Sequence, residues 1–143
     1  MTDFSELPPQ FEFHHLGYAT RGIDRERRVF ENLGYRIEGE TFVDPAQGVT
    51  GCFLVGAGPR IELLENSPGE ETLTAWLNAG VKVYHFAYRV PDIEAAIDWA
   101  RSKRGKVTVS PVAAVAFGGA KICFVMFPNG FLIEFIEDPD IQS

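Results

Sequence analysis

The sequence predicts an α+β fold in which two tandem β-α-β-β-β modules form one curved, mixed or antiparallel sheet. The first observation is an internal repeat, because the segment FHHLGYATRGID returns 70 residues later as VYHFAYRVPDIE. The second is that IELLEN, late in the first half, returns late in the second half as IEFIED. The third is that strand-like and helix-like segments follow in the same order in each half. We expect one domain over about residues 11–137.

The first module spans about residues 11–66. Its segments read as a strand, a helix and three strands, near 11–19, 23–33, 35–43, 49–55 and 60–65. The helix is expected because its apolar residues share one face, namely Ile23, Val29, Phe30 and Leu33. Gly34 is expected to end it. The turn-rich segments DPAQG and GAGP separate the three strands.

The second module spans about residues 81–137 and repeats this order. Its strand, helix and three strands are expected near 81–90, 92–103, 106–113, 121–127 and 131–137. Asp92 is a suitable residue to begin the helix. Its buried stripe is expected to consist of Ile93, Ala96, Ile97 and Ala100. PNG makes the last hairpin turn, and a linker helix near 70–79 joins the modules.

The charge and hydropathy of the chain argue against two kinds of partner. The net charge is −7 with only 13 Lys and Arg residues, whereas a nucleic-acid-binding protein normally needs a basic face. No apolar stretch is long enough to span a membrane. The N-terminus lacks the pattern of a secretion signal, so we expect a cytoplasmic protein. An anionic substrate would need a local positive group, for which Arg60 and Lys121 are candidates by position.

The two cysteines, Cys52 and Cys123, show no metal-binding spacing. Each lies in an apolar, strand-like run, CFLV or CFVM. We therefore expect buried free thiols rather than a disulfide or a nucleophile.

Four polar residues recur in matched places of the repeat. His15 and His85 are equivalent, and they are two of only three histidines. Glu62 and Glu134 each lie inside an apolar run, where a carboxylate is costly unless it is paired or bound to a cation. If the modules pair about a pseudo-twofold axis, the four side chains converge on one point. Imidazole and carboxylate ligands suit a divalent ion such as Zn, Co, Ni, Mn or Fe rather than Ca.

Each of these residues, taken singly, has an ordinary structural explanation. A strand histidine is most often structural, and a Glu between Ile and Leu commonly marks the solvated face of an antiparallel strand. The metal site is favoured because two types of ligand recur together in a repeat that has otherwise diverged. In regular strands Phe13 and Val83 would share the face of the neighbouring His15 and His85. His14 would point to the opposite face and would pack there or support the ligands.

The segments HHLGYAT, IELLEN, YHFAYRV and FLIEFIE resemble the four signature strands of the vicinal oxygen chelate superfamily, which includes glyoxalase I and methylmalonyl-CoA epimerase. The resemblance covers nearly the whole chain and implies the paired-module fold, a homodimer, and metal ligation by His15, Glu62, His85 and Glu134. The likeness is greatest to the epimerases, through QGV at 47–49 and FGGAK at 117–121. Those enzymes carry a catalytic Glu immediately before QGV, where this chain has Ala46.

The resemblance implies a metal-dependent isomerase, epimerase or lyase that stabilises the enolate of a small carbonyl substrate, with a CoA thioester as one candidate. Glu134 or Glu62 would also act as the catalytic base. Epimerisation needs a second base, and with Ala46 in place Asp44 is a weak substitute. Two alternatives stay open. One is a dioxygenase or thiol transferase of the same superfamily, and the other is a protein that binds and sequesters small molecules.

Overall fold

The structure, a computed structural model, describes residues 10–141 and contains one open sheet of eight strands. The strands lie in the order β2-β3-β4-β1-β5-β8-β7-β6. Their bounds are β1 (Glu12–Ala19), β2 (Arg36–Asp44), β3 (Val49–Val55), β4 (Ile61–Asn66), β5 (Val83–Val90), β6 (Lys106–Ala113), β7 (Lys121–Met126) and β8 (Leu132–Glu137). The expected α+β class and the expected repeat of modules are therefore confirmed. The expected domain limits stay a prediction.

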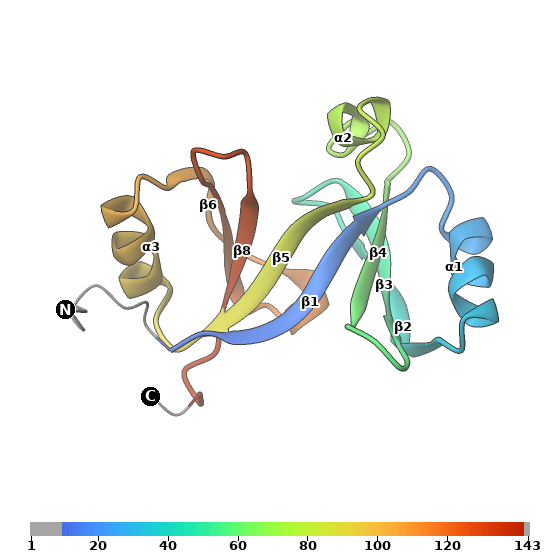
Figure 1. Ribbon diagram of the computed structural model, residues 1–143, viewed down its shortest axis with the longest axis horizontal. Helices are drawn as coiled ribbons and strands as arrows, with labels where there is room; N and C mark the ends of the chain where they lie inside the picture. Colours follow the sequence, from blue (N-terminus) through green and yellow to red (C-terminus); the bar gives the residue numbers. More distant parts are fainter. Residues whose placement is uncertain (1–9, 142–143) are drawn as a thin grey trace.

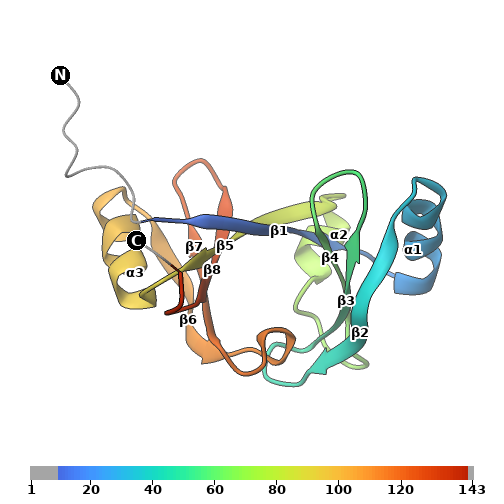
Figure 2. The same cartoon turned by 90° about the horizontal axis from the view of Figure 1, so that it is seen from below.

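The two modules join through their first strands. β1 pairs with β5 in antiparallel orientation, while β1 with β4 and β5 with β8 are parallel pairs. The remaining neighbours are antiparallel. In Figure 1, β1 and β5 cross the middle of the molecule, and each module extends to one side of them. Seen from below, the sheet curves into a cup with β1 and β5 at its base (Figure 2).

The two long helices cover the outer flanks of the sheet (Figure 1). In α3 (Ile93–Ser102), the Asp92 side chain accepts hydrogen bonds from two backbone N–H groups of the first turn, and the four predicted apolar residues are buried. In α1 (Ile23–Asn32), Ile23 is buried and Phe30 packs on the core beneath. The prediction that Val29 and Leu33 share the buried face of this helix is wrong, because Val29 is 53% exposed and Leu33 is 68% exposed. This helix meets the sheet along a narrow line only.

Two connections differ from the expected ones. The linker helix α2 (Thr74–Asn78) is shorter than expected, because Gly69 adopts a positive φ and the Asn66 side chain bonds to Leu73 and Thr74 just before the helix. A short 3₁₀ turn, η2 (Val115–Phe117), was not expected. It ends at Gly118, whose φ of 63° falls in the left-handed region that glycine adopts readily.

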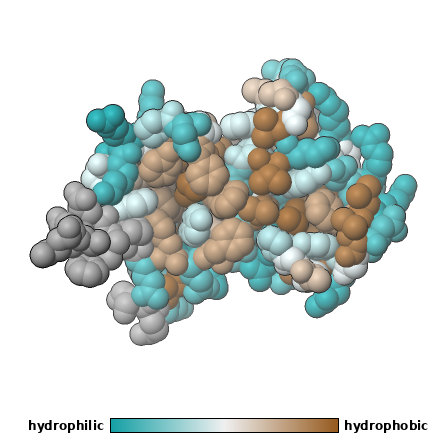
Figure 3. Space-filling model, in the orientation of Figure 1, coloured by the Kyte–Doolittle hydropathy of each residue, from teal (hydrophilic) through white to brown (hydrophobic). Residues whose placement is uncertain are grey.

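Both cysteines are buried and free, as predicted. Within residues 10–141, no helix is long and apolar enough to cross a membrane. Exposed apolar side chains include Phe13 on β1, Val83 on β5 and Phe131 just before β8. Figure 3 shows an apolar band over the middle of the molecule.

Candidate metal centre

Strand register brings the four predicted ligands together at the base of the cup. Gly17 pairs with Glu62 on one side and with His85 on the other. Ala87 pairs with His15 on one side and with Glu134 on the other. Each small residue therefore lies between one imidazole and one carboxylate. The two lines of residues lie side by side because β1 and β5 are neighbours.

One atom from each of the four side chains lies within 4.8 Å of the other three. His15 Nε2 is 3.1 Å from Glu62 Oε1 and 3.2 Å from Glu134 Oε1. His85 Nε2 is 3.7 Å and 3.2 Å from the same two oxygens. The two Nε2 atoms are 3.2 Å apart. All four residues are buried, so the cluster is closed to bulk solvent on the strand side.

This arrangement requires glycine at position 17, because there is no space for a side chain there. A Cβ atom on Gly17 would lie 2.0 Å from His85 Cε1 and 2.1 Å from His85 Nδ1. The room left by this glycine is thus filled by the ring of His85. The equivalent residue in the second module, Ala87, is fully buried and keeps its methyl group.

Two β-bulges place a second aromatic residue beside each predicted ligand histidine. Phe13 pairs with Tyr88 and His15 with Ala87, which leaves His14 as the extra residue. On β5, His85 pairs with Gly17 and Val83 with Tyr18, which leaves Tyr84 as the extra residue. A bulge commonly re-aims a side chain next to a functional site. His14 and Tyr84 occupy equivalent positions in the repeat, each immediately before a predicted ligand histidine.

The bulges overturn part of the expected facing of β1 and β5. Phe13 is 43% exposed and Val83 is 42% exposed, whereas His15 and His85 are buried. His14 does not point away from His15, since its Nδ1 lies 2.8 Å from His15 Nδ1. Burial, then the charge of His15, lowers the pKa of His14 to about 3, so its ring is neutral. A neutral His14 can accept the Nδ1 proton of His15 and so orient His15 Nε2 toward the cluster.

The charges of the cluster favour an ionised, cation-seeking site. Burial alone would lower the pKa of His15, but Glu62 and Glu134 outweigh it and raise that pKa to about 9. Burial alone would raise the pKa of Glu134, but hydrogen bonding and charge from His15 and His85 outweigh it and lower that pKa to about 2. Without a cation, the ionised Glu134 carboxylate therefore has a protonated His15 beside it at neutral pH.

The four atoms fit a divalent ion by spacing and by chemistry. Four ligand atoms about 2.1 Å from one ion lie about 3.4 Å from each other in a tetrahedral site. Five of the separations among these atoms, from 3.1 to 3.7 Å, bracket that spacing. Glu134 Oε1 also lacks a well-directed hydrogen bond within the described part of the chain, although it is buried. A buried oxygen in that state is poised to accept a cation.

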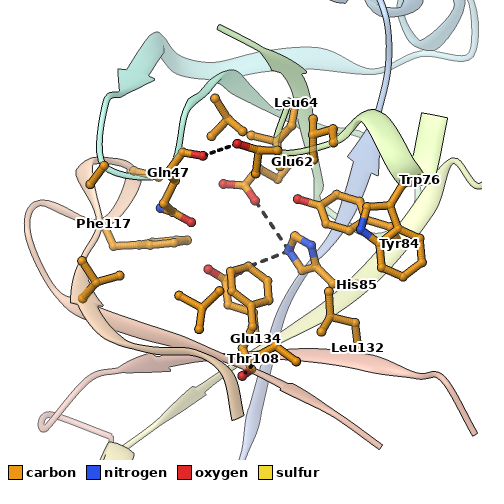
Figure 4. Close-up of a pocket in the computed structure, with 18 of the residues that line it drawn as sticks. Gln47, Glu62, Leu64, Trp76, Tyr84, His85, Thr108, Phe117, Leu132 and Glu134 are labelled. Atoms are coloured by element: carbon orange, nitrogen blue, oxygen red, sulfur yellow. Dashed lines mark hydrogen bonds and ion pairs between the residues drawn. The ribbon is translucent and has the colours of Figure 1, made fainter. Parts of the chain in front are cut away.

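The cluster opens on one side into a pocket of about 530 Å³. Glu62, His85 and Glu134 form its floor, as Figure 4 shows. Its walls also include Phe117, from the FGGAK segment, and two aromatic residues that the sequence analysis did not single out, Trp76 and Tyr84. The one available signal was the repeat itself, because Tyr84 matches His14 at the same offset of 70 residues as His85 matches His15.

The other predicted site residues take different places. Ala46 lines the pocket, so no carboxylate stands where epimerases carry their catalytic Glu. Asp44 is buried and is not among the residues that line the pocket. Its carboxylate accepts hydrogen bonds from the Gln47 backbone and side chain and from the Val115 backbone. Arg60 donates to the His14 carbonyl and to Glu38. Neither Arg60 nor Lys121 lines the pocket.

A model of the glyoxalase/bleomycin resistance protein/dioxygenase superfamily matches residues 14–124. A search of curated proteins finds no match. Among solved structures, a hypothetical protein from Bacillus halodurans C-125 is 25% identical with a TM-score of 0.78, and the match covers 94% of this chain and 99% of that one.

Methylmalonyl-CoA epimerases are also similar in structure. The enzyme from Mycobacterium tuberculosis is 22% identical with a TM-score of 0.72, over 88% of this chain and 87% of that one. An epimerase in complex with methylmalonyl-CoA and ammonium is 22% identical with a TM-score of 0.70, over 93% and 98% of the two chains. At this level of identity the likeness shows the shared fold.

Proposed function

Because the chain belongs to the glyoxalase/bleomycin resistance protein/dioxygenase superfamily, we propose that it is a metal-dependent enzyme acting at the carbon next to a substrate carbonyl. The reaction class is an isomerisation, an epimerisation or a lyase reaction. The observation that carries the proposal is the buried group of two imidazoles and two carboxylates at the floor of a pocket. His15, Glu62, His85 and Glu134 would hold the ion, with Zn, Co, Ni or Mn as the candidates.

When bound, a divalent ion supplies Lewis acidity that stabilises negative charge developing on a substrate oxygen. The chain supplies the proton acceptor. Glu62 and Glu134 both line the pocket, and the lowered pKa of Glu134 keeps that carboxylate ionised at neutral pH. A C–H held above this floor therefore meets a carboxylate base.

The walls favour a reaction on one face of the carbon. Ala46 carries no proton, and the Asp44 carboxylate is occupied by Gln47 and Val115. Apart from Glu62 and Glu134, which are assigned to the ion and to the first base, the described lining of the pocket offers no carboxylate for the second base that epimerisation of the usual kind requires. Isomerisation or lyase chemistry is favoured over epimerisation for this reason. The expected homodimer and the cytoplasmic location stay predictions.

Elemental analysis of the purified protein tests the metal centre. Wild-type protein should carry close to one divalent ion per chain, and His15→Ala and His85→Ala should lose it. Glu62→Gln should also lower the metal content. Glu65→Gln is its matched control and should not, because Glu65 lies on the same strand outside the cluster. Unchanged metal content in both histidine variants would remove the metal centre.

Hydrogen–deuterium exchange at the α-carbon tests the reaction. Metal-loaded protein should catalyse deuterium uptake from D₂O into a carbonyl substrate, and Glu134→Gln should slow it. A panel should include methylmalonyl-CoA, which one structural neighbour binds, and neutral hydroxyketones. A second candidate function, a protein that only binds small molecules, is favoured by the apolar lining of the pocket. Tight binding with no exchange in any member of the panel would support that second function. Oxygen uptake by an Fe(II)-loaded form would instead favour a dioxygenase.

A further inference from the structure

The pocket above the cluster has no positively charged wall. Among its described lining residues there is no Lys or Arg, and the only carboxylates are Glu62 and Glu134. Arg60 is engaged elsewhere with the His14 carbonyl and Glu38. Phosphate and carboxylate groups are normally held by Arg or Lys. Apart from the proposed ion at the floor, a substrate rich in negative charge therefore finds no positive side chain in the described lining of this pocket. The chain as a whole carries a net charge of −7.

The walls instead offer apolar and aromatic surface from both modules. The first module contributes Phe42 and Leu64, and the second contributes Phe124 and Leu132. Trp76, from the linker helix, stacks at a tilt on Tyr84 with ring centroids 5.6 Å apart. Most of the lining is thus suited to a planar or branched hydrocarbon group.

Tyr84 brings an unused polar group into this apolar cavity. The bulge on β5 turns its side chain to the same side as His85, and the two ring centroids are 4.5 Å apart. Figure 4 shows its hydroxyl pointing into the pocket on the side of Glu62. The hydroxyl makes no hydrogen bond within residues 10–141, unlike that of Tyr18, which donates to Glu26 at 2.6 Å. A phenol left without a partner at a pocket wall is available to a ligand.

We propose that the pocket takes an uncharged carbonyl compound with an aromatic or branched apolar body, and that the Tyr84 hydroxyl donates a hydrogen bond to one of its oxygens. This inference rests on the proposed function, since the floor of the pocket is the metal centre. It departs from the CoA thioester bound by a structural neighbour. The volume of about 530 Å³ suits a small molecule of this kind.

The test compares three probes on cobalt-loaded and on metal-free protein. Phenacyl alcohol is a neutral aromatic hydroxyketone, hydroxyacetone has the same oxygens without the ring, and methylmalonyl-CoA carries several negative charges. Binding is followed by the fluorescence of Trp76 in a Trp99→Phe background, because these are the two tryptophans of the chain. Phenacyl alcohol should bind at least about tenfold more tightly than hydroxyacetone, owing to burial of the ring. It should also bind more tightly than methylmalonyl-CoA.

Tyr84→Phe should weaken phenacyl alcohol about fivefold, as expected for loss of one neutral hydrogen bond. Tyr88→Phe is the matched control, because Tyr88 lies on the same strand and does not line this pocket. Equal binding of the two hydroxyketones, or tighter binding of methylmalonyl-CoA, would overturn the substrate class. Equal effects of the two Tyr variants would overturn the role of Tyr84.

Cobalt content, measured on the same samples, separates the two proposals. Preference for phenacyl alcohol in a protein that binds no cobalt would refute the metal enzyme and support the apolar pocket. Bound cobalt without that preference would refute the apolar substrate and leave the metal centre standing.

Discussion

Gly17→Ala is the sharpest perturbation of the metal centre, because it changes one atom and removes no ligand. The new methyl carbon would lie 2.0 Å from His85 Cε1, 2.1 Å from Nδ1 and 2.5 Å from Nε2, where ordinary contacts begin at 3.4 Å. The ring would have to retreat by about 1.4 Å to restore such a contact. Metal–ligand distances tolerate changes of about 0.2 Å. His85 would therefore leave the cluster.

The expected loss follows from that displacement. Changes in groups that only support a ligand weaken metal binding by about 10- to 100-fold, so loss of the ligand itself should cost at least about 100-fold. The forced repacking should lower the free energy of unfolding by about 1–3 kcal/mol. Backbone strain adds nothing here, since Gly17 is not among the residues with positive φ.

Calorimetric titration with cobalt and urea unfolding of the metal-free protein would measure the two effects separately. Gly22→Ala is the matched control, because a Cβ at Gly22 meets nothing within 4 Å. It should leave cobalt affinity unchanged and lower stability by no more than about 1 kcal/mol, since Gly22 caps α1. Cobalt affinity of Gly17→Ala within threefold of wild type would refute the placement of His85 as a ligand.

Three further predictions follow from buried groups. Asp44→Asn should lower the free energy of unfolding, measured by urea unfolding, by about 2–4 kcal/mol, because the Asp44 carboxylate joins β2 to the Val115 backbone of the other module. A loss below about 1 kcal/mol would contradict this. Cys52 and Cys123 should react with Ellman's reagent only after unfolding, because burial raises both thiol pKa values, that of Cys123 to about 12; rapid labelling of native protein would disagree. Apparent cobalt affinity should rise about tenfold per pH unit from neutrality up to about pH 9. The pKa of His15 is about 9 without metal, so below that pH the ring must release a proton before it can bind the ion. A flat profile in calorimetric titrations would count against His15 as a ligand.

The repeat is what made the candidate site predictable. Single strand histidines and single Glu residues have ordinary explanations, but equivalent positions in a duplicated unit must be related by the symmetry of the fold. That reasoning places His15, Glu62, His85 and Glu134 together before any coordinates, and the structure brings them within 4.8 Å. Whether they bind an ion stays a prediction.

The facing of side chains near the site was less predictable. Alternation along a strand assumes one residue per step, and each bulge adds one residue that sequence spacing does not reveal. His14 and Tyr84 were therefore placed wrongly or overlooked. The exposure of Leu33 has a different cause, because apolar periodicity shows which face of a helix is apolar but not how much of that face the sheet covers.

The equal division of the four ligands between the modules has a consequence for the molecule as a whole. Each module supplies one imidazole and one carboxylate, so an ion bound by all four would cross-link the two modules at the β1–β5 interface. At a free ion concentration a thousand times the dissociation constant, ion binding adds about 4 kcal/mol to the free energy of unfolding. The stability of this protein in a cell would then depend on the concentration of free metal. When metal is scarce, the interface between the two modules would be the first part to lose stability.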